Sequence, residues 1–176
     1  MLVLLAAAVA ILLAAVMWFW SGSRAASEAE ATTTETIDLY FPAEQGWVAA
    51  ESHQIADLPE AGNERAQRVV EALVSGPTGT EFYAPLPAGT LVDGVFVNPD
   101  GTCIVELVSE TYANPPQMGS RQEVELFASL LRSLKTNVPE VEQVVVLWNG
   151  RQPESFGGHL DTTRPLNLDP AWGTSP

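Results

Sequence analysis

The sequence predicts an α+β domain. We expect a two-layer sandwich in which two helices cover one face of a mainly antiparallel sheet, in the order β-β-α-β-β-α-β-β, preceded by one transmembrane helix. Three observations lead to this prediction. Segments of alternating apolar and polar residues come in pairs joined by turn residues, which is typical of hairpins. Two longer segments repeat apolar residues at helical spacing. The first 20 residues contain no charged side chain.

The first predicted elements are a hairpin and a helix. Residues 37–41 alternate apolar and polar side chains, and residues 47–55 return as a second strand after a turn. The helix begins at Asn63, whose side chain can cap it. It ends at Gly76 and Pro77, because glycine accepts a left-handed C-cap and proline cannot continue a helix. Its predicted core positions are Ala66, Val69, Val70, Leu73 and Val74.

A second hairpin follows, with strands at residues 91–97 and 103–108. The Asn-Pro-Asp-Gly turn at residues 98–101 joins them, because proline presets φ and glycine accepts a positive φ. Gly94 inside the first strand predicts a bulge. Cys103 lies in an apolar strand pattern and is interpreted as a buried, inert thiol, and a single cysteine cannot form an internal disulfide.

The second helix begins at a predicted capping box, in which Ser120 and Glu123 satisfy free backbone amides reciprocally. Residues 141–148 are apolar on both alternating faces, which is typical of a central strand. Asn149 and Gly150 predict a tight hairpin turn, and a short last strand runs through Phe156. The predicted core stripe of the helix is Val124, Phe127, Leu131 and Leu134, with Leu126 and Leu130 on one flank.

The chain divides into a transmembrane anchor (1–20), a flexible linker (21–35), the domain (36–168) and a tail (169–176). About 20 apolar residues span a hydrocarbon core of about 30 Å. The alternative is a cleaved signal peptide, whose apolar core is usually shorter and follows a basic start. A lipid anchor is not expected, because it needs a cysteine just after the apolar run and the single cysteine is Cys103. Arg24, taken alone, favours a cytoplasmic domain.

The charge of the chain argues against one class of partner. It carries 22 acidic and 8 basic residues, for a net charge of −14. Nucleic-acid binding requires a basic patch or stripe, and the sequence contains none. Acidic excess also disfavours tight contact with anionic lipid headgroups.

Seven short segments, in order, resemble the GerMN domain, the sporulation and spore germination domain of bacteria. They are residues 38–41, 71–78, 86–90, 105–109, 148–150, 158–161 and 164–166. The resemblance implies an extracytoplasmic domain of the bacterial cell envelope, similar to ring-building modules that assemble protein complexes. We expect a single copy here, unlike the two-domain spore protein. This orientation outweighs Arg24, so we expect a single-pass protein of the cytoplasmic membrane whose domain faces the periplasm or cell surface.

The motif residues of this resemblance are interpreted as structural. They are Gly76, Pro77, Gly89, Gly150, Gly158, His159 and Asp161. His159 and Asp161 could otherwise be metal ligands or an acid–base pair, but zinc needs three or four ligands and the other histidine, His53, lies in a distant strand. Ser75 and Ser109 lack a nucleophile elbow. We therefore predict no catalytic residue, no metal and no cofactor.

The remaining candidate is a surface for a partner. Leu126 and Leu130, with Tyr112 and Met118 of the loop before the helix, form the predicted partner surface. The alternative is that the two leucines pack under that loop. Candidate partners are envelope proteins, a second copy or peptidoglycan. The leading hypothesis is a non-enzymatic module that mediates protein association.

Two rival hypotheses remain. The first is a wall-processing enzyme or a glycan-binding module, and a glycan binder would expose aromatic rings, for which Trp47, Tyr83 and Trp148 are the candidates. The second is a small-molecule sensor, which would need a sizeable apolar pocket.

Overall fold

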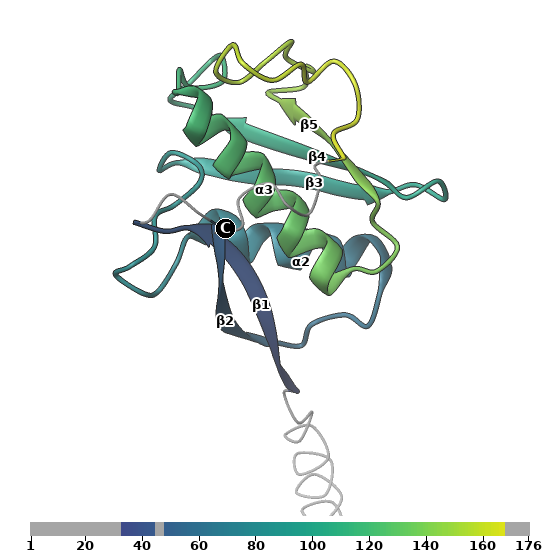
Figure 1. The fold of residues 1–176 in the computed structure, drawn as a ribbon. Helices are drawn as coiled ribbons and strands as arrows, with labels where there is room; N and C mark the ends of the chain where they lie inside the picture. Colours follow the sequence, from purple (N-terminus) through teal and green to yellow (C-terminus); the bar gives the residue numbers. More distant parts are fainter. Residues whose placement is uncertain (1–32, 45–47, 168–176) are drawn as a thin grey trace, which may run out of the picture. The chain divides into compact units, whose positions relative to one another are not determined.

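Seven regular elements lie in residues 33–44 and 48–167, the part of the chain that the computed structural model describes (Figure 1). They are β1 (Thr34–Pro42), β2 (Val48–Ala56), α2 (Gly62–Ser75), β3 (Thr90–Val97), β4 (Thr102–Ser109), α3 (Ser120–Asn137) and β5 (Gln143–Trp148). The predicted order is confirmed through β5. The predicted last strand is wrong, because the described residues after β5 form isolated bridges instead, from Arg151 to Trp148 and from Leu166 to Val144.

The predicted anchor, the tail and most of the predicted linker lie outside the described residues. Strand β1 begins at Thr34, which the sequence had placed in the linker. Among the described residues, no helix combines the length and the apolar character that crossing a membrane requires.

The strands form two sheets and not one. Strands β1 and β2 make an antiparallel pair, and β3, β4 and β5 make a three-stranded sheet in that order. In this second sheet β3 and β4 are antiparallel, whereas β4 and β5 are parallel. The prediction of one sheet is therefore wrong, whereas its mainly antiparallel character is confirmed, because the β4–β5 pair is the parallel one among the three strand pairs. This pair is parallel because α3 crosses over between β4 and β5, and a helical crossover of this kind returns the chain in the same direction.

The turn chemistry that the sequence indicated is confirmed. Gly101 has a φ of 79°, and Asn98 accepts a hydrogen bond of 3.0 Å from its amide. The register of β3 against β4 shifts between Val92 and Gly94, which is the predicted bulge. Asn149 and Gly150 both have a positive φ, as a tight turn requires.

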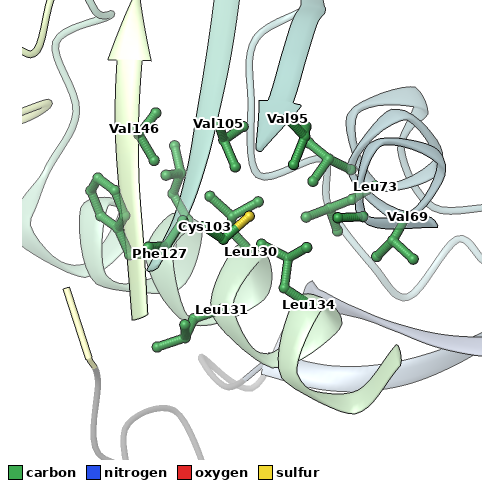
Figure 2. Close-up of a cluster of buried hydrophobic side chains, with 14 of the residues drawn as sticks. Val69, Leu73, Val95, Cys103, Val105, Phe127, Leu130, Leu131, Leu134 and Val146 are labelled. Atoms are coloured by element: carbon green, nitrogen blue, oxygen red, sulfur yellow. The ribbon is translucent and has the colours of Figure 1, made fainter. Parts of the chain in front are cut away.

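Helix α3 lies between the three-stranded sheet and the β1–β2 hairpin. Figure 2 shows Leu130 and Leu134 of α3 close to Cys103 at the middle of the core. Cys103 is fully buried, as predicted, and burial raises the pKa of its thiol to about 12. The other side of α3 contacts β1, where the Ser133 hydroxyl accepts a 2.9 Å hydrogen bond from the Tyr40 amide. Because α3 is covered on both sides, the predicted two-layer arrangement is incomplete.

The first helix, α2, starts differently from the prediction. Its N-cap is Ala61, and the Asn63 side chain accepts a 2.8 Å hydrogen bond from the amide of Val97 instead of capping the helix. The C-terminal signal is confirmed, because Gly76 has a φ of 89° and its amide donates to the Leu73 carbonyl at 3.1 Å. Asn63 thus joins α2 to the end of β3.

The core prediction is tested most simply at Phe127. Its side chain is fully buried and meets Phe156 edge to face, with 5.3 Å between ring centroids. Phe127→Ala should lower the free energy of unfolding by about 3–5 kcal/mol, because it leaves a cavity that the packed core cannot close. Urea denaturation measures this. The neighbouring Val124→Ala, at a partly exposed position, should cost about 1 kcal/mol or less, and equal losses would contradict the assignment of the core.

Candidate functional site

Glu123 is a fully buried carboxylate at the start of α3, and it organises the loop that follows β5. Its Oε1 accepts hydrogen bonds from the Ser155 hydroxyl at 2.6 Å and the Phe156 amide at 3.0 Å. Its Oε2 accepts a bond from the His159 amide at 2.9 Å. The predicted capping role of Glu123 is wrong. The N-cap is Gly119, and Gln122 reaches back to the Gly119 amide at 3.0 Å.

The electrostatics of Glu123 favour its charged form. Burial would raise the pKa of this carboxyl, but hydrogen bonds from Ser155 and from the amides of Gly157, His159 and Phe156 outweigh it and lower the pKa. A carboxylate that is held ionised by fixed amides and buried away from solvent cannot serve readily as a general acid. Glu123 therefore acts as an anchor for the loop.

His159 and Asp161 do not converge on a common site. The His159 ring nitrogen Nδ1 lies 3.2 Å from the Glu123 carboxylate, and the ring is partly exposed. Asp161 instead accepts a 3.0 Å hydrogen bond from the Thr163 amide and pairs with Arg164 at 3.0 Å. Between them, Gly158 adopts a φ of 87°. In the described part of the chain no three histidine, cysteine or carboxylate residues are grouped as a metal site would need.

A second carboxylate, Glu51, holds the segment after α2 in the same way. It accepts hydrogen bonds from the Thr78 hydroxyl at 2.7 Å and the Gly79 amide at 2.6 Å, and His53 Nε2 lies 2.6 Å from it. Burial would raise the pKa of Glu51, but the hydrogen bonds from Thr78, His53 and Gly79 outweigh it and lower the pKa to about 2. The segment that Gly76 and Pro77 introduce is thereby fixed.

The Trp-Asn-Gly motif at the end of β5 fastens the loop that follows β4. The indole of Trp148 and the side-chain amide of Asn149 both donate to the Tyr112 carbonyl, at 2.9 and 3.0 Å. The Gly150 amide donates to Glu106 Oε1 at 2.7 Å. Upstream, Gly89 has a φ of 83° immediately before β3. These motif residues make contacts within the domain.

The predicted partner surface is partly wrong. Leu126 and Leu130 are 2% and 3% exposed, because α3 is covered on both sides and has no free flank. Tyr112 is 39% exposed. Met118 lines a groove of about 630 Å³ together with Tyr83 and several prolines. The alternative considered from the sequence, that the leucines are packed inside, is the one the structure has.

Among the described residues, the aromatic and serine side chains that the rival functions would use are mostly engaged inside the domain. Trp148 is 2% exposed and unavailable to a glycan, Trp47 lies outside the described residues, and Tyr83 is 53% exposed in the groove. The Ser75 hydroxyl donates to the Glu71 carbonyl at 2.8 Å, and Ser109 accepts from the Tyr112 amide at 3.3 Å. Both hydroxyls are thus engaged by backbone groups.

An apolar surface that none of the described helices covers lies on the three-stranded sheet, and the sequence analysis missed it. We call it the open sheet face, and it consists of Leu91, Phe96, Ile104, Val108, Val145 and Leu147. Helices α2 and α3 pack against the opposite face, which carries Val95, Cys103, Val105 and Val146 (Figure 2).

The register brings the six side chains together. Phe96 pairs with Ile104, and Ile104 pairs with Val145, so one apolar row crosses the sheet. Leu91 and Phe96 are 61% and 58% exposed. None of the six packs into the core that the described residues form. The prediction that residues 141–148 form a central strand is wrong, because β5 lies at one side of the sheet and β4 is central. The apolar residues on the second face of β5 were the sequence signal for the open sheet face.

The role of Glu123 can be tested by removing its charge. Glu123→Gln should lower the free energy of unfolding by about 3 kcal/mol, because an amide group then faces backbone donors that it cannot satisfy. In hydrogen–deuterium exchange, the amides of Phe156, His159 and Leu160 should exchange much faster than those of β4. The exposed Glu64→Gln provides the matched control. Unchanged exchange at residues 156–160 would contradict the anchoring role.

Glu51 should make stability depend on pH. Its pKa is lower in the folded chain than the ordinary value of 4.5, so its contribution is complete above pH 4.5 and is lost as the pH falls toward 2. Glu51→Gln should therefore lose less stability than the wild type between pH 6 and pH 2.5, in urea titrations at each pH. Thr78→Val, which removes one donor, should lie between them. Identical pH profiles of the wild type and Glu51→Gln would contradict this account.

Comparison with known proteins identifies the fold and the family. The family model described as sporulation and spore germination, Germane, matches residues 38–154. None of the curated proteins compared with the chain matches it significantly.

Three solved structures share the fold. The tandem GerMN domains of the Bacillus subtilis sporulation protein GerM are 24% identical, with a TM-score of 0.59 over 77% of this chain and 46% of theirs. The first GerMN domain of GerM alone is 23% identical, with a TM-score of 0.55 over 74% of this chain and 94% of that one. A candidate lipoprotein from Clostridium perfringens is 19% identical, with a TM-score of 0.52 over 77% and 87% of the two chains. Since the family model matches more than half of the residues, the chain belongs to the Germane family of sporulation and spore germination domains.

Proposed function

We propose that this protein is a non-enzymatic, membrane-tethered module of the bacterial cell envelope that holds a partner protein on the open sheet face. The observation that carries the proposal is that face itself. Its six apolar side chains lie in cross-strand rows on a rigid sheet, and Leu91 and Phe96 are more than half exposed. Contiguous apolar surface of this kind marks protein interaction sites.

The arrangement of the acidic groups supports binding over catalysis. An enzyme that acts on the cell wall needs carboxylates or a nucleophile and base converging on a cleft. Here Glu51 and Glu123 are engaged by hydroxyl and backbone donors, and their lowered pKa values keep them ionised. They serve the scaffold that presents the surface.

The location rests on the N-terminal sequence and on the relatives. The uncharged apolar run at residues 1–20 supports a membrane anchor. One structural relative is described as a sporulation protein and another as a candidate lipoprotein. We therefore place the domain on the extracytoplasmic side.

Protease accessibility and extraction test this location. Protease added to intact spheroplasts should digest the domain and leave cytoplasmic marker proteins whole. Carbonate washing should leave the undigested protein in the membrane pellet. Protection of the domain from protease would contradict the orientation, and release into the wash would show that no anchor is retained.

Site-specific crosslinking tests the binding surface. A photo-crosslinking residue at Phe96 in the full chain, in native membranes, should give a recurrent crosslinked protein. The same residue at Tyr83, which is exposed to a similar degree in the groove, is the matched control. Crosslinks from Tyr83 and none from Phe96 would contradict the open sheet face, and crosslinks to peptidoglycan would favour the glycan-binding alternative.

A further inference from the structure

Glu106 is a carboxylate placed in the middle of the open sheet face. It pairs with Gly94 on β3 and with Leu147 on β5. Alternation along β4 puts it on the same side as Ile104 and Val108. It therefore lies between two apolar rows, the row from Phe96 through Ile104 to Val145 and the shorter row in which Leu91 pairs with Val108. Strands β4 and β5 lie within the described chain, and Glu106 is the one charged residue on their outward side.

No ion pair to Glu106 is found in the described part of the chain. Its Oε1 accepts a 2.7 Å hydrogen bond from the Gly150 amide, and none of the ion pairs recorded among the described residues includes it. The side chain is half-buried, and water can still solvate the charge. A wholly apolar partner that covered this face would remove that water without supplying a hydrogen-bond donor or a cation in its place. Burial of this kind is unfavourable for an ionised carboxylate.

Most of the charged residues around the open sheet face are acidic. Asp93 lies at the bulge of β3, and Asp100, Glu110 and Glu142 lie at the ends of the strands, whereas Arg151 is the basic residue that follows β5. Two copies packed face to face would bring these carboxylates and two Glu106 side chains together, in a chain of net charge −14. Like charges at an interface select against such pairing.

We propose that the occupant of the open sheet face is a different protein, whose apolar surface presents an arginine or lysine at its centre to Glu106. The apolar rows supply contact area, and the ion pair replaces the lost hydration of Glu106 and fixes the register of the complex. This inference rests on the proposed function and adds the chemistry of the partner.

The experiment uses the full chain in native membranes with the photo-crosslinking residue at Leu91, and the crosslinked partner peptide is sequenced. That peptide should contain apolar residues next to an arginine or lysine. Glu106→Gln should reduce the crosslinking yield at least about tenfold. Glu64→Gln, which removes the same charge from the exposed surface of α2, should leave the yield unchanged. Glutamine at position 106 keeps an acceptor for the Gly150 amide, so thermal melting should show an intact fold.

A charge exchange completes the test. Glu106→Arg should abolish crosslinking, and changing the mapped basic residue of the partner to glutamate should restore it. Crosslinks that map to a second copy, or that persist fully in Glu106→Gln, would overturn this inference and leave the proposed association function standing. Absence of any protein crosslink from the open sheet face, or crosslinks to lipid alone, would overturn both.

Discussion

Helix α3 is buried on both sides, and the rest of the structure depends on the polar contacts that make this burial possible. A helix between two sheets must satisfy the backbone groups of its neighbours as well as its own. At its C-terminal end, the Ser133 hydroxyl accepts from the Tyr40 amide, and the Asn137 amide donates to the Asp38 carbonyl at 2.8 Å. These bonds occupy the edge of β1 as another strand would. At its N-terminal end, the Glu123 carboxylate accepts hydrogen bonds from backbone amides of the loop after β5.

The position of α3 also explains which surface is left for a partner. Because α3 covers the inner face of the three-stranded sheet and also crosses over between β4 and β5, the outer face receives neither of the two helices of the described chain (Figure 1). The loops at the strand ends are held by carboxylates and by the Trp-Asn-Gly motif, so they cannot easily fold over that face. The open sheet face is thus a consequence of the connectivity, and its apolar side chains have no role in the core.

The sequence predicted the turns and the C-terminal end of α2 well, because these depend on neighbouring residues. Gly76, Gly94 and the Asn149–Gly150 turn behave as their residue types indicate. What the sequence did not reveal is which strands pair and which helix faces are covered. Ser129 and Ser133 are fully buried. In a sequence, serine at these helix positions indicates a side that faces solvent. Leu126 and Leu130 were therefore predicted to lie on an exposed flank of the helix.

The wrong prediction for Glu123 has a similar cause. Glu123 stands three residues after Ser120, where a capping glutamate is expected, but its partners lie more than 30 residues away in the chain. Only tertiary structure could show those partners. By contrast, the apolar residues on both faces of β5 were visible in the sequence. They predicted a central strand, whereas β5 lies at one side of the sheet and its outer apolar residues belong to the open sheet face.

The central claim is that the open sheet face is covered in the cell. Carbene footprinting of the full chain, in native membranes and after purification in detergent, measures this directly. The account predicts that Leu91 and Phe96 are labelled strongly in the purified protein and weakly in membranes, while labelling of Tyr83 stays the same. Equal labelling of Leu91 and Phe96 in both preparations would contradict it.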